Sequence, residues 1–332
     1  MDLTVTSSLS SGGSPSPAGP RVVVLAPAPL LTVTVESSTV GDEIHFHPGG
    51  QGVWIARLVA SLGVESILCS TFGGETGQVI EALLKSWGIE VRPVSAEGWN
   101  GAYIHDRRSG ERVIVAQNDA NPRSRHDVDE LYGVAFAAGL EADVVVLGGP
   151  ETSRLARAEV PEAVPIEIYS RLARDLRRNG VTVVVDLCGE VLEAALEGGV
   201  DVLKVSDEEL EITGEVPDTS TGSVVEAMKR LRSRGAGAVV VTCADRPILA
   251  LIGDTIHELR SPGVDPIDDR GAGDSVTAGI TAALASGFDL IGAVRFGAAA
   301  GALNVTRRGL GSGSRREIEL LARHVEVTEV RP

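Results

Sequence analysis

The chain has 332 residues, of which 43% are hydrophobic, enough to build a large buried core. Its 30 basic and 46 acidic residues give a formal net charge of −16, which repels nucleic acid and anionic membrane surfaces. Any site for a phosphorylated ligand must therefore be positive locally, against the field of the whole protein.

The first twenty residues lack the basic start and the continuous apolar stretch of a signal peptide. They are rich in Ser, Gly and Pro, so we expect residues 1–20 to form a disordered tail. No apolar run reaches the ~20 residues needed to cross a bilayer. The three cysteines (Cys69, Cys188 and Cys243) cannot form a disulfide framework, and each stands at or just after an apolar run. We therefore expect a protein of the reducing cytoplasm.

Buried strands and helices alternate along most of the chain. Short Val-rich runs predict strands. Longer segments with a helical pattern that end at a glycine predict helices. The strands are expected at 22–25, 31–36, 65–71, 89–94, 143–147, 181–186, 200–205, 238–242 and 248–251. The helices are expected from a glycine-rich turn at 48–52 to about 62, and at about 75–87, 165–179, 221–234, 273–286, 289–306 and 314–324. This alternation indicates an α/β fold with a mostly parallel sheet that helices cover on both faces.

The stretch from 101 to 117 breaks the alternation. Two apolar segments, 102–105 and 112–115, flank the polar turn 106–111, which is a hairpin signal. Together with the segment 31–46, this hairpin could form a small separate sheet.

The strongest candidate site is the run Gly271-Ala272-Gly273-Asp274, at the start of an expected helix. Small residues let successive backbone N–H groups point into one cavity, and the positive end of the helix dipole suits a phosphate group in transfer. A carboxylate beside such a hole can accept a proton from an attacking hydroxyl. By itself the string fits equally well a glycine-rich turn with Asp274 in the first helical turn.

The segment 268–274 resembles the C-terminal signature of the ribokinase-like, PfkB-type carbohydrate kinases, Asp-Thr-Thr-Gly-Ala-Gly-Asp. Asp269 and Arg270 replace the usual threonines. Three further motifs match the family in order and spacing. Residues 49–52 resemble the family's Gly-Gly-x-Gly motif, and residues 72–77 resemble its Phe-Gly-x-Asp/Glu-x-x-Gly motif. Residues 203–210 resemble its Lys-x-Asn-x-x-Glu motif.

The resemblance spans roughly residues 21–328 and is closest to the phosphofructokinase-like branch. It implies a ribokinase-like kinase domain over 21–332, with a three-layer α/β/α fold and a β lid from about 31–47 and 99–119. Closure of such a lid over the sugar excludes water and so suppresses ATP hydrolysis. The implied activity is ATP-dependent and Mg²⁺-dependent transfer of the γ-phosphate to a hydroxyl of a sugar or sugar phosphate.

The resemblance also implies roles for single residues. Gly271, Ala272 and Gly273 would form the anion hole for the transferred phosphoryl group, and Asp274 would be the catalytic base. Glu209 would help to organise Mg²⁺ and its waters. From the residues alone, Glu209 fits better a solvated carboxylate in an acidic helix.

The nucleotide side differs from the family pattern. Ser206 replaces the usual Asn, and Thr242 remains from a Thr-x-Gly-x-x-Gly segment whose glycines are both gone. Arg270, just before the anion hole, could bind a nucleotide or substrate phosphate. A surface ion pair of Arg270 with Asp268 or Asp269 is an equally good interpretation.

The substrate side departs further. The resemblance places Gly49, Gly50, Gln51 and Trp54 at the sugar, but Trp54 stands where the family has a sugar-binding Asn. Leu30 replaces a hydroxyl-binding Asp, and Gly101 replaces the Arg that holds the substrate phosphate. Each such contact contributes about 1.5–3 kcal/mol, so the standard substrate pose is lost. The candidate replacements are His45, His47, Gln51, Trp54, Asn118, Arg107 and Arg108.

Simpler interpretations of these residues stay open, because Trp54 could be a core aromatic and the lid histidines and arginines could be solvated. Trp54 could also stack on a base, so a nucleoside-like acceptor is an alternative substrate. A catalytically weak ligand-binding or regulatory protein is the alternative outside enzymes. Lid strands of the family often pair across a dimer, so a homodimer through the lid is a further expectation.

Overall fold

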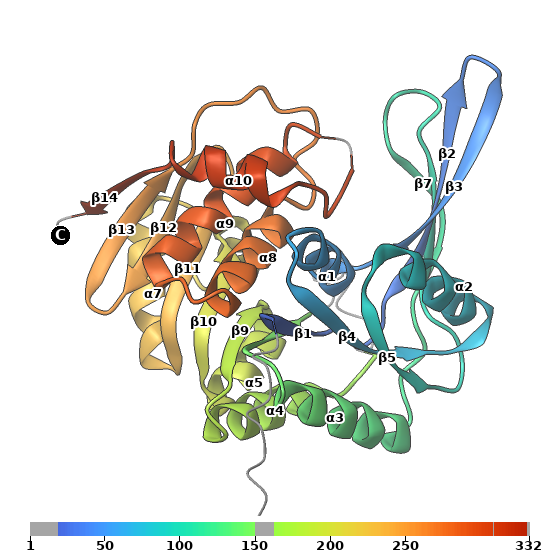
Figure 1. Ribbon diagram of the computed structural model, residues 1–332, viewed down its shortest axis with the longest axis horizontal. Coiled ribbons are helices and arrows are strands. Elements are labelled where there is room, and N and C mark those ends of the chain that lie inside the picture. Colours follow the sequence, from blue (N-terminus) through green and yellow to red (C-terminus); the bar gives the residue numbers. More distant parts are fainter. Residues whose placement is uncertain (1–18, 150–162, 308, 331–332) are drawn as a thin grey trace, which may run out of the picture.

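A large twisted sheet runs through the protein, and the computed structural model describes residues 19–149, 163–307 and 309–330 (Figure 1). Residues 1–18 of the expected disordered tail lie outside these ranges, and only residues 19 and 20 of it are described. From one edge to the other the sheet comprises β14 (Glu326–Val330), β13 (Thr255–Arg260), β12 (Arg246–Ile252), β11 (Ala236–Cys243), β10 (Val200–Ser206), β9 (Thr182–Asp186), β8 (Val144–Gly148), β1 (Arg21–Leu25), β4 (Glu65–Phe72) and β5 (Glu90–Ser95). Every neighbouring pair from β5 to β11 is parallel, and the pairs from β11 to β14 are antiparallel. The predicted mostly parallel sheet is confirmed.

Two apolar cores lie on the two faces of the sheet, because successive strand side chains point to opposite sides. In β1, Val23 and Leu25 face one core and Val22 and Val24 face the other. The first core is covered by α3 (Arg125–Gly139), α4 (Glu167–Arg178), α5 (Gly189–Gly198) and α7 (Thr221–Ser233). The second is covered by α1 (Gln51–Ser61), α2 (Gly74–Leu84), α8 (Ala272–Ala285), α9 (Leu290–Asn304) and α10 (Arg315–Ala322). The three-layer α/β/α prediction is therefore confirmed.

Four elements have no counterpart in the sequence prediction: α3, α5, β13 and β14. Helix α3 does carry a capping box between Ser124 and Asp127, a signal that was available in the sequence. Strand β14 is a mostly exposed edge strand, so it lacks the apolar pattern of the buried strands and is held by pairing with β13. No helix in the described part of the chain has both the length and the apolarity needed to span a bilayer.

A second sheet of four strands, here called the lid sheet, stands beside the large one (Figure 1). Its order is β3 (Gly41–Gly49), β2 (Leu30–Ser38), β6 (Ala102–Asp106) and β7 (Val113–Asn118). The predicted hairpin forms as β6–β7, and its partner hairpin is β2–β3. Parallel pairing of β2 with β6 joins the two hairpins, which confirms the separate sheet.

Asn100 anchors the chain where it enters the lid sheet. Its side chain is fully buried, and its Oδ1 accepts a hydrogen bond of 2.8 Å from the backbone of Gly73. Its Nδ2 donates to the carbonyls of Pro29, at 2.8 Å, and Thr71, at 3.1 Å. One amide therefore ties the start of β6 to the chain entering β2, to β4 and to the start of α2.

Helices α8 and α9 pack with their backbones almost in contact, because glycines face each other. A Cβ atom on Gly279 would lie 2.8 Å from the Cα of Gly297 and 3.0 Å from the Cβ of Ala300. This close approach fixes where the N-terminus of α8 lies relative to the sheet.

We predict that Gly279→Ala lowers the free energy of unfolding by about 1–3 kcal/mol, because the added methyl group forces the two helices apart. Gly133→Ala is the matched control, since nothing lies within 4 Å of a Cβ atom at this position in α3. Alanine is the better helix former, so the control is expected to gain up to about 1 kcal/mol. Urea denaturation of both variants measures the difference, and equal shifts would show that the close helix packing is unimportant.

Candidate active site

A cleft of about 2390 Å³ opens where β10 and β11 end and α8 begins, with the lid sheet as one wall. The carboxyl ends of parallel strands are the usual ligand-binding edge of an open α/β sheet. The Gly-Ala-Gly-Asp run, Ser206, Thr242 and Trp54 all line this cleft. The structure thus brings together residues that are more than 200 positions apart in the sequence.

A buried ion pair forms the floor of the site. The Nζ of Lys204, at the end of β10, lies 3.1 Å from the Oδ1 of Asp186, at the end of β9. Their side chains are 5% and 1% exposed, so neither charge is solvated. The Oγ1 of Thr277, in α8, donates a hydrogen bond of 2.5 Å to the Oδ2 of Asp186. Strands β9 and β10 and helix α8 are therefore joined through one carboxylate.

The ammonium group of Lys204 lies directly against the Gly-Ala-Gly turn. A Cβ atom on Gly273 would be only 2.7 Å from Nζ, so the lysine reaches this place because the residue above it is glycine. Burial disfavours the charged ammonium, but the carboxylates of Asp186, Glu209 and Asp274 outweigh burial and raise the pKa of Lys204. The positive end of the ion pair therefore lies beneath the turn.

The turn itself is shaped for anion binding. Gly271 has φ of 69°, a left-handed conformation that favours glycine, and caps the N-terminus of α8. The amides of a first helical turn have no intrahelical acceptor, so those of Gly273 and Asp274 are suited to a phosphate. Asn304 fixes the turn, since its Nδ2 donates to the carbonyl of Arg270 at 2.7 Å. Its Oδ1 accepts from the hydroxyl of Ser275 at 3.1 Å.

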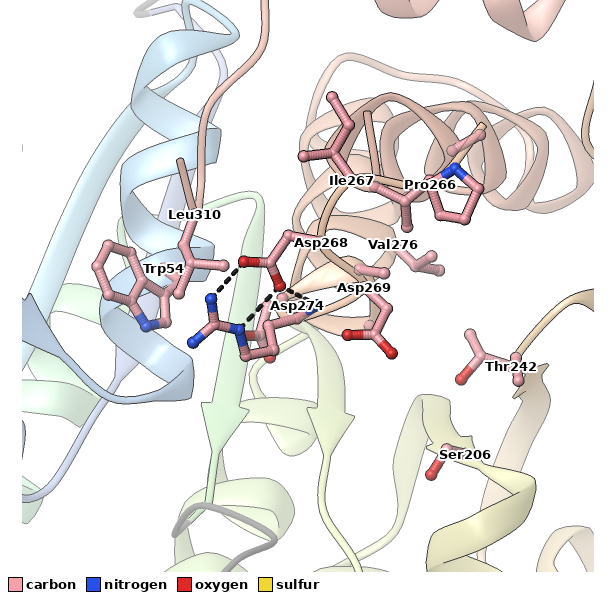
Figure 2. Close-up of a pocket in the computed structure, with 18 of the residues that line it drawn as sticks. Trp54, Ser206, Thr242, Pro266, Ile267, Asp268, Asp269, Asp274, Val276 and Leu310 are labelled. Atoms are coloured by element: carbon pink, nitrogen blue, oxygen red, sulfur yellow. Dashed lines mark hydrogen bonds and ion pairs between the residues drawn. The ribbon is translucent and has the colours of Figure 1, made fainter. Parts of the chain in front are cut away.

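Asp274 lies at the mouth of this turn and faces the cleft (Figure 2). It is half-buried and close enough to Lys204 to raise the pKa of that lysine. A carboxylate that is open to the cleft and adjacent to an anion-binding turn can take a proton from a bound hydroxyl.

Glu209 is not the solvated carboxylate that the acidic run favours. It is 7% exposed, and its Oε2 accepts hydrogen bonds from the backbone and the hydroxyl of Ser206, at 2.8 and 2.9 Å. The hydroxyl of Ser206 in turn accepts a hydrogen bond from the backbone of Glu209, which forms a capping box at the start of α6 (Asp207–Ile212). The solvated interpretation is wrong because the cap folds the carboxylate back toward the strand end, near Lys204.

Ser206 and Thr242 lie side by side, because they pair in register at the ends of β10 and β11. Figure 2 shows both of them across the cleft from Trp54. Pro266 and Ile267, apolar residues of the loop before α8, also line the cleft and lie near Val276 in Figure 2. The cleft therefore combines polar strand ends with an apolar wall.

Arg270 lines the cleft but is already bound to a carboxylate. Its Nε donates to the Oδ1 of Asp268 at 2.8 Å and its Nη2 binds Oδ2, so the predicted ion pair forms with Asp268. In Figure 2, Asp268 lies toward Trp54 and Leu310 and far from Ser206. The guanidinium is therefore nearer the lid end of the cleft than the expected nucleotide end.

Trp54 is both a core aromatic and a cleft-lining residue, so it fits both interpretations that the sequence left open. Its side chain is 9% exposed and packs against Trp87 at 5.8 Å between ring centroids, and it also lines the cleft. Gln51 lines the cleft as well, and its Oε1 accepts a hydrogen bond of 2.9 Å from the backbone of Gly149. Gly49 and Gly50 are not among the cleft-lining residues.

The inner face of the lid sheet is polar and closes the cleft from above. The strand register of β2 with β3 and with β6 places polar side chains opposite one another on this face. The hydroxyl, imidazole and phenol groups on it belong to Thr32, Thr34, His45, His47, Tyr103 and His105. His45 and His47 are thus partly covered lid histidines that face the cleft. Asn118 is exposed and does not line the cleft.

Arg107 and Arg108 differ in their surroundings. Arg108 is half-exposed and bound by Asp106 and Asp42, which agrees with a solvated turn residue. Arg107 is 26% exposed and extends toward Asp268 across the cleft, with 3.9 Å between Nη2 and Oδ2. The solvated interpretation therefore fits Arg108 and is wrong for Arg107.

Two site residues carried no assignment in the sequence analysis: Asp186 and Lys204. A signal existed, since each is a charged residue in an otherwise Val-rich strand that is buried on both faces. Pairing across neighbouring strands satisfies both charges, and the order of those strands follows from the topology rather than from local pattern.

Across the described ranges, no three His, Cys, Asp or Glu side chains gather closely enough to hold a metal ion. Mg²⁺ in phosphoryl-transfer sites commonly binds one or two carboxylates together with substrate phosphates and water. Asp269 and Glu209 both line the cleft that residues 271–274 also line, so the donor set fits a metal that is held partly by the phosphates of a bound nucleotide.

Comparisons with known proteins agree with this geometry. Residues 26–317 match the family described as pfkB family carbohydrate kinase. The ATP-dependent 6-phosphofructokinase isozyme 2 of Mycobacterium tuberculosis is 28% identical over 313 residues, which cover 90% of this chain and 88% of the relative. The 1-phosphofructokinase of Bacillus subtilis is 28% identical over 316 residues, which cover 93% and 99%.

Solved structures are similar over nearly the whole chain. Phosphofructokinase-2 from Escherichia coli in complex with potassium has a TM-score of 0.79 at 25% identity, over 92% of this chain and 98% of its own. A possible 1-phosphofructokinase from Thermotoga maritima has the same TM-score of 0.79 at 20% identity, over 94% of this chain and 100% of its own, which supports the fold.

We predict that Lys204→Met lowers the free energy of unfolding by about 3–5 kcal/mol, because Asp186 is left as a buried carboxylate without its counter-charge. Lys229→Met is the matched control, since Lys229 pairs with Glu226 on the surface and its loss is expected to cost at most about 1 kcal/mol. Urea denaturation at neutral pH measures both. A loss for Lys204→Met no larger than the control's would contradict a structural role of the pair.

Proposed function

Because the chain belongs to the pfkB family of carbohydrate kinases and is an ATP-dependent sugar kinase, we propose that Asp274 is its catalytic base and that residues 271–273 form the anion hole. The acceptor is a hydroxyl group of a sugar or a sugar phosphate. The observation that carries this proposal is the position of Asp274 beside an anion-binding turn with the buried Lys204 ammonium beneath it.

The transfer follows from this arrangement. The acceptor hydroxyl approaches the γ-phosphorus in line with the bond to the leaving oxygen, and Asp274 removes the hydroxyl proton as the new O–P bond forms. The bond between the γ-phosphorus and the bridging oxygen breaks, and its electron pair leaves with ADP. The turn amides and the charge of Lys204 stabilise the negative charge on the transferring group, which is the main catalytic term in phosphoryl transfer.

The nucleotide would lie along the ends of β10 and β11. Ser206 and Thr242 offer hydroxyl groups to the phosphates, while Pro266 and Ile267 offer an apolar surface to the base. Glu209 would orient Mg²⁺ through its waters, with Asp269 as the nearer carboxylate donor. When bound, Mg²⁺ supplies a positive charge that bridges and neutralises the phosphate oxygens.

The outer face of the lid sheet favours pairing with a second copy of the chain. This face is apolar, and it consists of Val33, Val35, Ile44, Phe46 and Ile104. Ile44, Phe46 and Ile104 are 60%, 52% and 40% exposed. An exposed apolar face of this size is typical of a protein–protein interface. The edge strands β3 and β7 can also pair with strands of a second copy. We propose a homodimer through the lid.

A cytoplasmic location is part of the proposal. Cys69, Cys188 and Cys243 are free thiols, and burial raises the pKa of Cys69 and of Cys243 to about 12, so both stay protonated. ATP, the proposed phosphate donor, is the second reason for this location.

We predict that Asp274→Asn lowers kcat by at least about 100-fold with any accepted sugar, because the amide cannot take the hydroxyl proton. Release of ADP is measured with Mg-ATP and a panel of hexoses, hexose phosphates and nucleosides. A free energy of unfolding equal to that of the native protein would show that the variant keeps the fold. Full activity of the variant would contradict the assignment of Asp274.

The same panel decides between the alternatives. Turnover with nucleosides but not sugars would support a nucleoside-like acceptor stacked on Trp54. The absence of acceptor-dependent turnover throughout the panel would support a ligand-binding or regulatory protein.

For the dimer, we predict that Phe46→Glu raises the dissociation constant at least about tenfold, because it places a charge in the apolar lid face. Leu320→Glu is the control, since Leu320 is a similarly exposed apolar residue on α10, outside the lid sheet. Sedimentation equilibrium measures association. A native protein that is monomeric at all concentrations would rule out the lid dimer.

A further inference from the structure

The segment after α9 runs along the loop that leads into the turn at 271–274. The carbonyl of Val305 accepts a hydrogen bond of 2.7 Å from the backbone N–H of Ile267. Asn304, one residue earlier, donates from Nδ2 to the carbonyl of Arg270 at 2.7 Å. The position of the turn therefore depends on this segment as well as on the buried ion pair of Lys204.

Leu310 supplies the contact of this segment with the turn itself. A Cβ atom on Gly271 would lie 2.9 Å from Cδ2 of Leu310, so the leucine side chain packs directly on the glycine that caps α8. Figure 2 shows Leu310 and Trp54 on the same side of the cleft. A hydrocarbon side chain forms no directional bond, so the place of Leu310 depends on what holds its backbone.

Arg57 holds that backbone from helix α1. Its Nη1 donates a hydrogen bond of 3.1 Å to the carbonyl of Leu310. The next residue also packs on α1, because a Cβ atom on Gly311 would lie 2.7 Å from the carbonyl oxygen of Trp54 and 3.3 Å from Cβ of Arg57. Residues 310 and 311 are therefore fixed to the helix that carries Trp54.

Two indole rings fix the guanidinium of Arg57 in turn. Its Cζ lies 4.1 Å from the ring centroid of Trp87 and 5.9 Å from that of Trp54. The side chain is half-buried, and burial lowers its pKa with no compensating carboxylate among the described residues. The charge is instead stabilised by the aromatic faces and by the carbonyl of Leu310, and both contacts fix the direction of the planar group.

We propose that Arg57 is a positioning residue for phosphoryl transfer, which acts through Leu310 on the turn at 271–274. This inference rests on the proposed function, because it assigns a further residue to the same kinase site. Arg57 fixes the backbone of Leu310 on α1, and the leucine side chain transmits that position to Gly271. The turn amides then face the transferring phosphoryl group without rearrangement, as electrostatic stabilisation of a transition state requires.

The first test compares the steady-state kinetics of Arg57→Met with those of the native protein, with Mg-ATP and an acceptor that the native protein uses. Displacement of the turn weakens binding of the transition state more than binding of the ground state, so kcat is expected to fall about 10- to 100-fold. KM for ATP and KM for the acceptor are expected to stay within about threefold. Arg57→Lys can still donate to the carbonyl and is expected to regain part of kcat.

Arg315→Met is the matched control. The guanidinium of Arg315 also lies over an aromatic ring, 5.9 Å from the centroid of Phe296, and its Nε donates to the carbonyl of Leu62 at 2.8 Å. Arg315 does not line the cleft. Because the two variants lose the same kinds of contact, Arg315→Met is expected to lose stability to a similar extent while keeping kcat. If kcat falls equally in both variants, destabilisation alone explains the effect and the inference is wrong.

A double-mutant cycle with Leu310→Ala tests the connection to the turn. Leu310→Ala removes the contact with Gly271 and is expected to lower kcat by a factor similar to that of Arg57→Met. Since both changes break the same connection, kcat of the double variant is expected to lie no more than about threefold below that of the weaker single variant. Two factors that multiply would rule out the inference, because Arg57 would then act independently of Leu310.

Nucleotide binding without turnover separates this inference from the proposed function. Calorimetry measures the dissociation constants of Mg-ADP, alone and with fluoroaluminate, which mimics the planar transferring phosphoryl group. Arg57→Met is expected to bind Mg-ADP within about twofold of the native protein, but to lose at least about tenfold of the affinity that fluoroaluminate adds. Equal affinity of both proteins for the fluoroaluminate complex would contradict the inference and leave the kinase assignment intact. If the native protein neither binds Mg-ADP nor phosphorylates any acceptor, the proposed function and the inference both fail.

Discussion

The buried pair between Lys204 and Asp186 is the constraint on which the site depends. Two charges are removed from water, and each is tolerated only because the other lies 3.1 Å away. The pair fixes the ends of β9 and β10 relative to each other, and Thr277 links α8 to the same carboxylate. Since only a glycine at position 273 leaves room for the ammonium, the strand ends and the turn at 271–274 form one rigid unit.

This rigid unit faces a part of the protein that is built differently. The lid sheet is joined to the body through polar anchors such as Asn100 and through the apolar packing of Leu31 against the second core. Its inner face is lined by hydroxyl and imidazole groups. Arg107 is its contact with Asp268 across the cleft. In the proposed mechanism, this division gives one end of the cleft a fixed geometry for phosphoryl transfer and leaves the lid sheet at the other end to contact the acceptor.

Local pattern was sufficient for most of the large sheet, because its parallel strands are buried on both faces and therefore read as continuous Val-rich runs. It was insufficient for β14, whose exposed polar residues are held by backbone pairing alone, and for α3, where the capping signal at Ser124 went unused. In the site, the Gly-Ala-Gly-Asp run was interpretable only together with the three other family motifs, because by itself it fits a glycine-rich turn equally well. Glu209 was misjudged because an acidic run looks solvated unless the capping box with Ser206 is recognised.

The sequence by itself determined the family resemblance, the Gly-Ala-Gly-Asp motif and the absence of the family's usual residues at Leu30, Trp54 and Gly101, since these depend on residue identity along the chain. Only the tertiary structure decided which charges meet. Lys204 finds Asp186 because β9 and β10 are neighbours in the sheet, and Arg107 reaches Asp268 because the lid sheet and the loop before α8 line the same cleft. Electrostatic interaction depends on distance and burial, and neither is encoded in local sequence spacing.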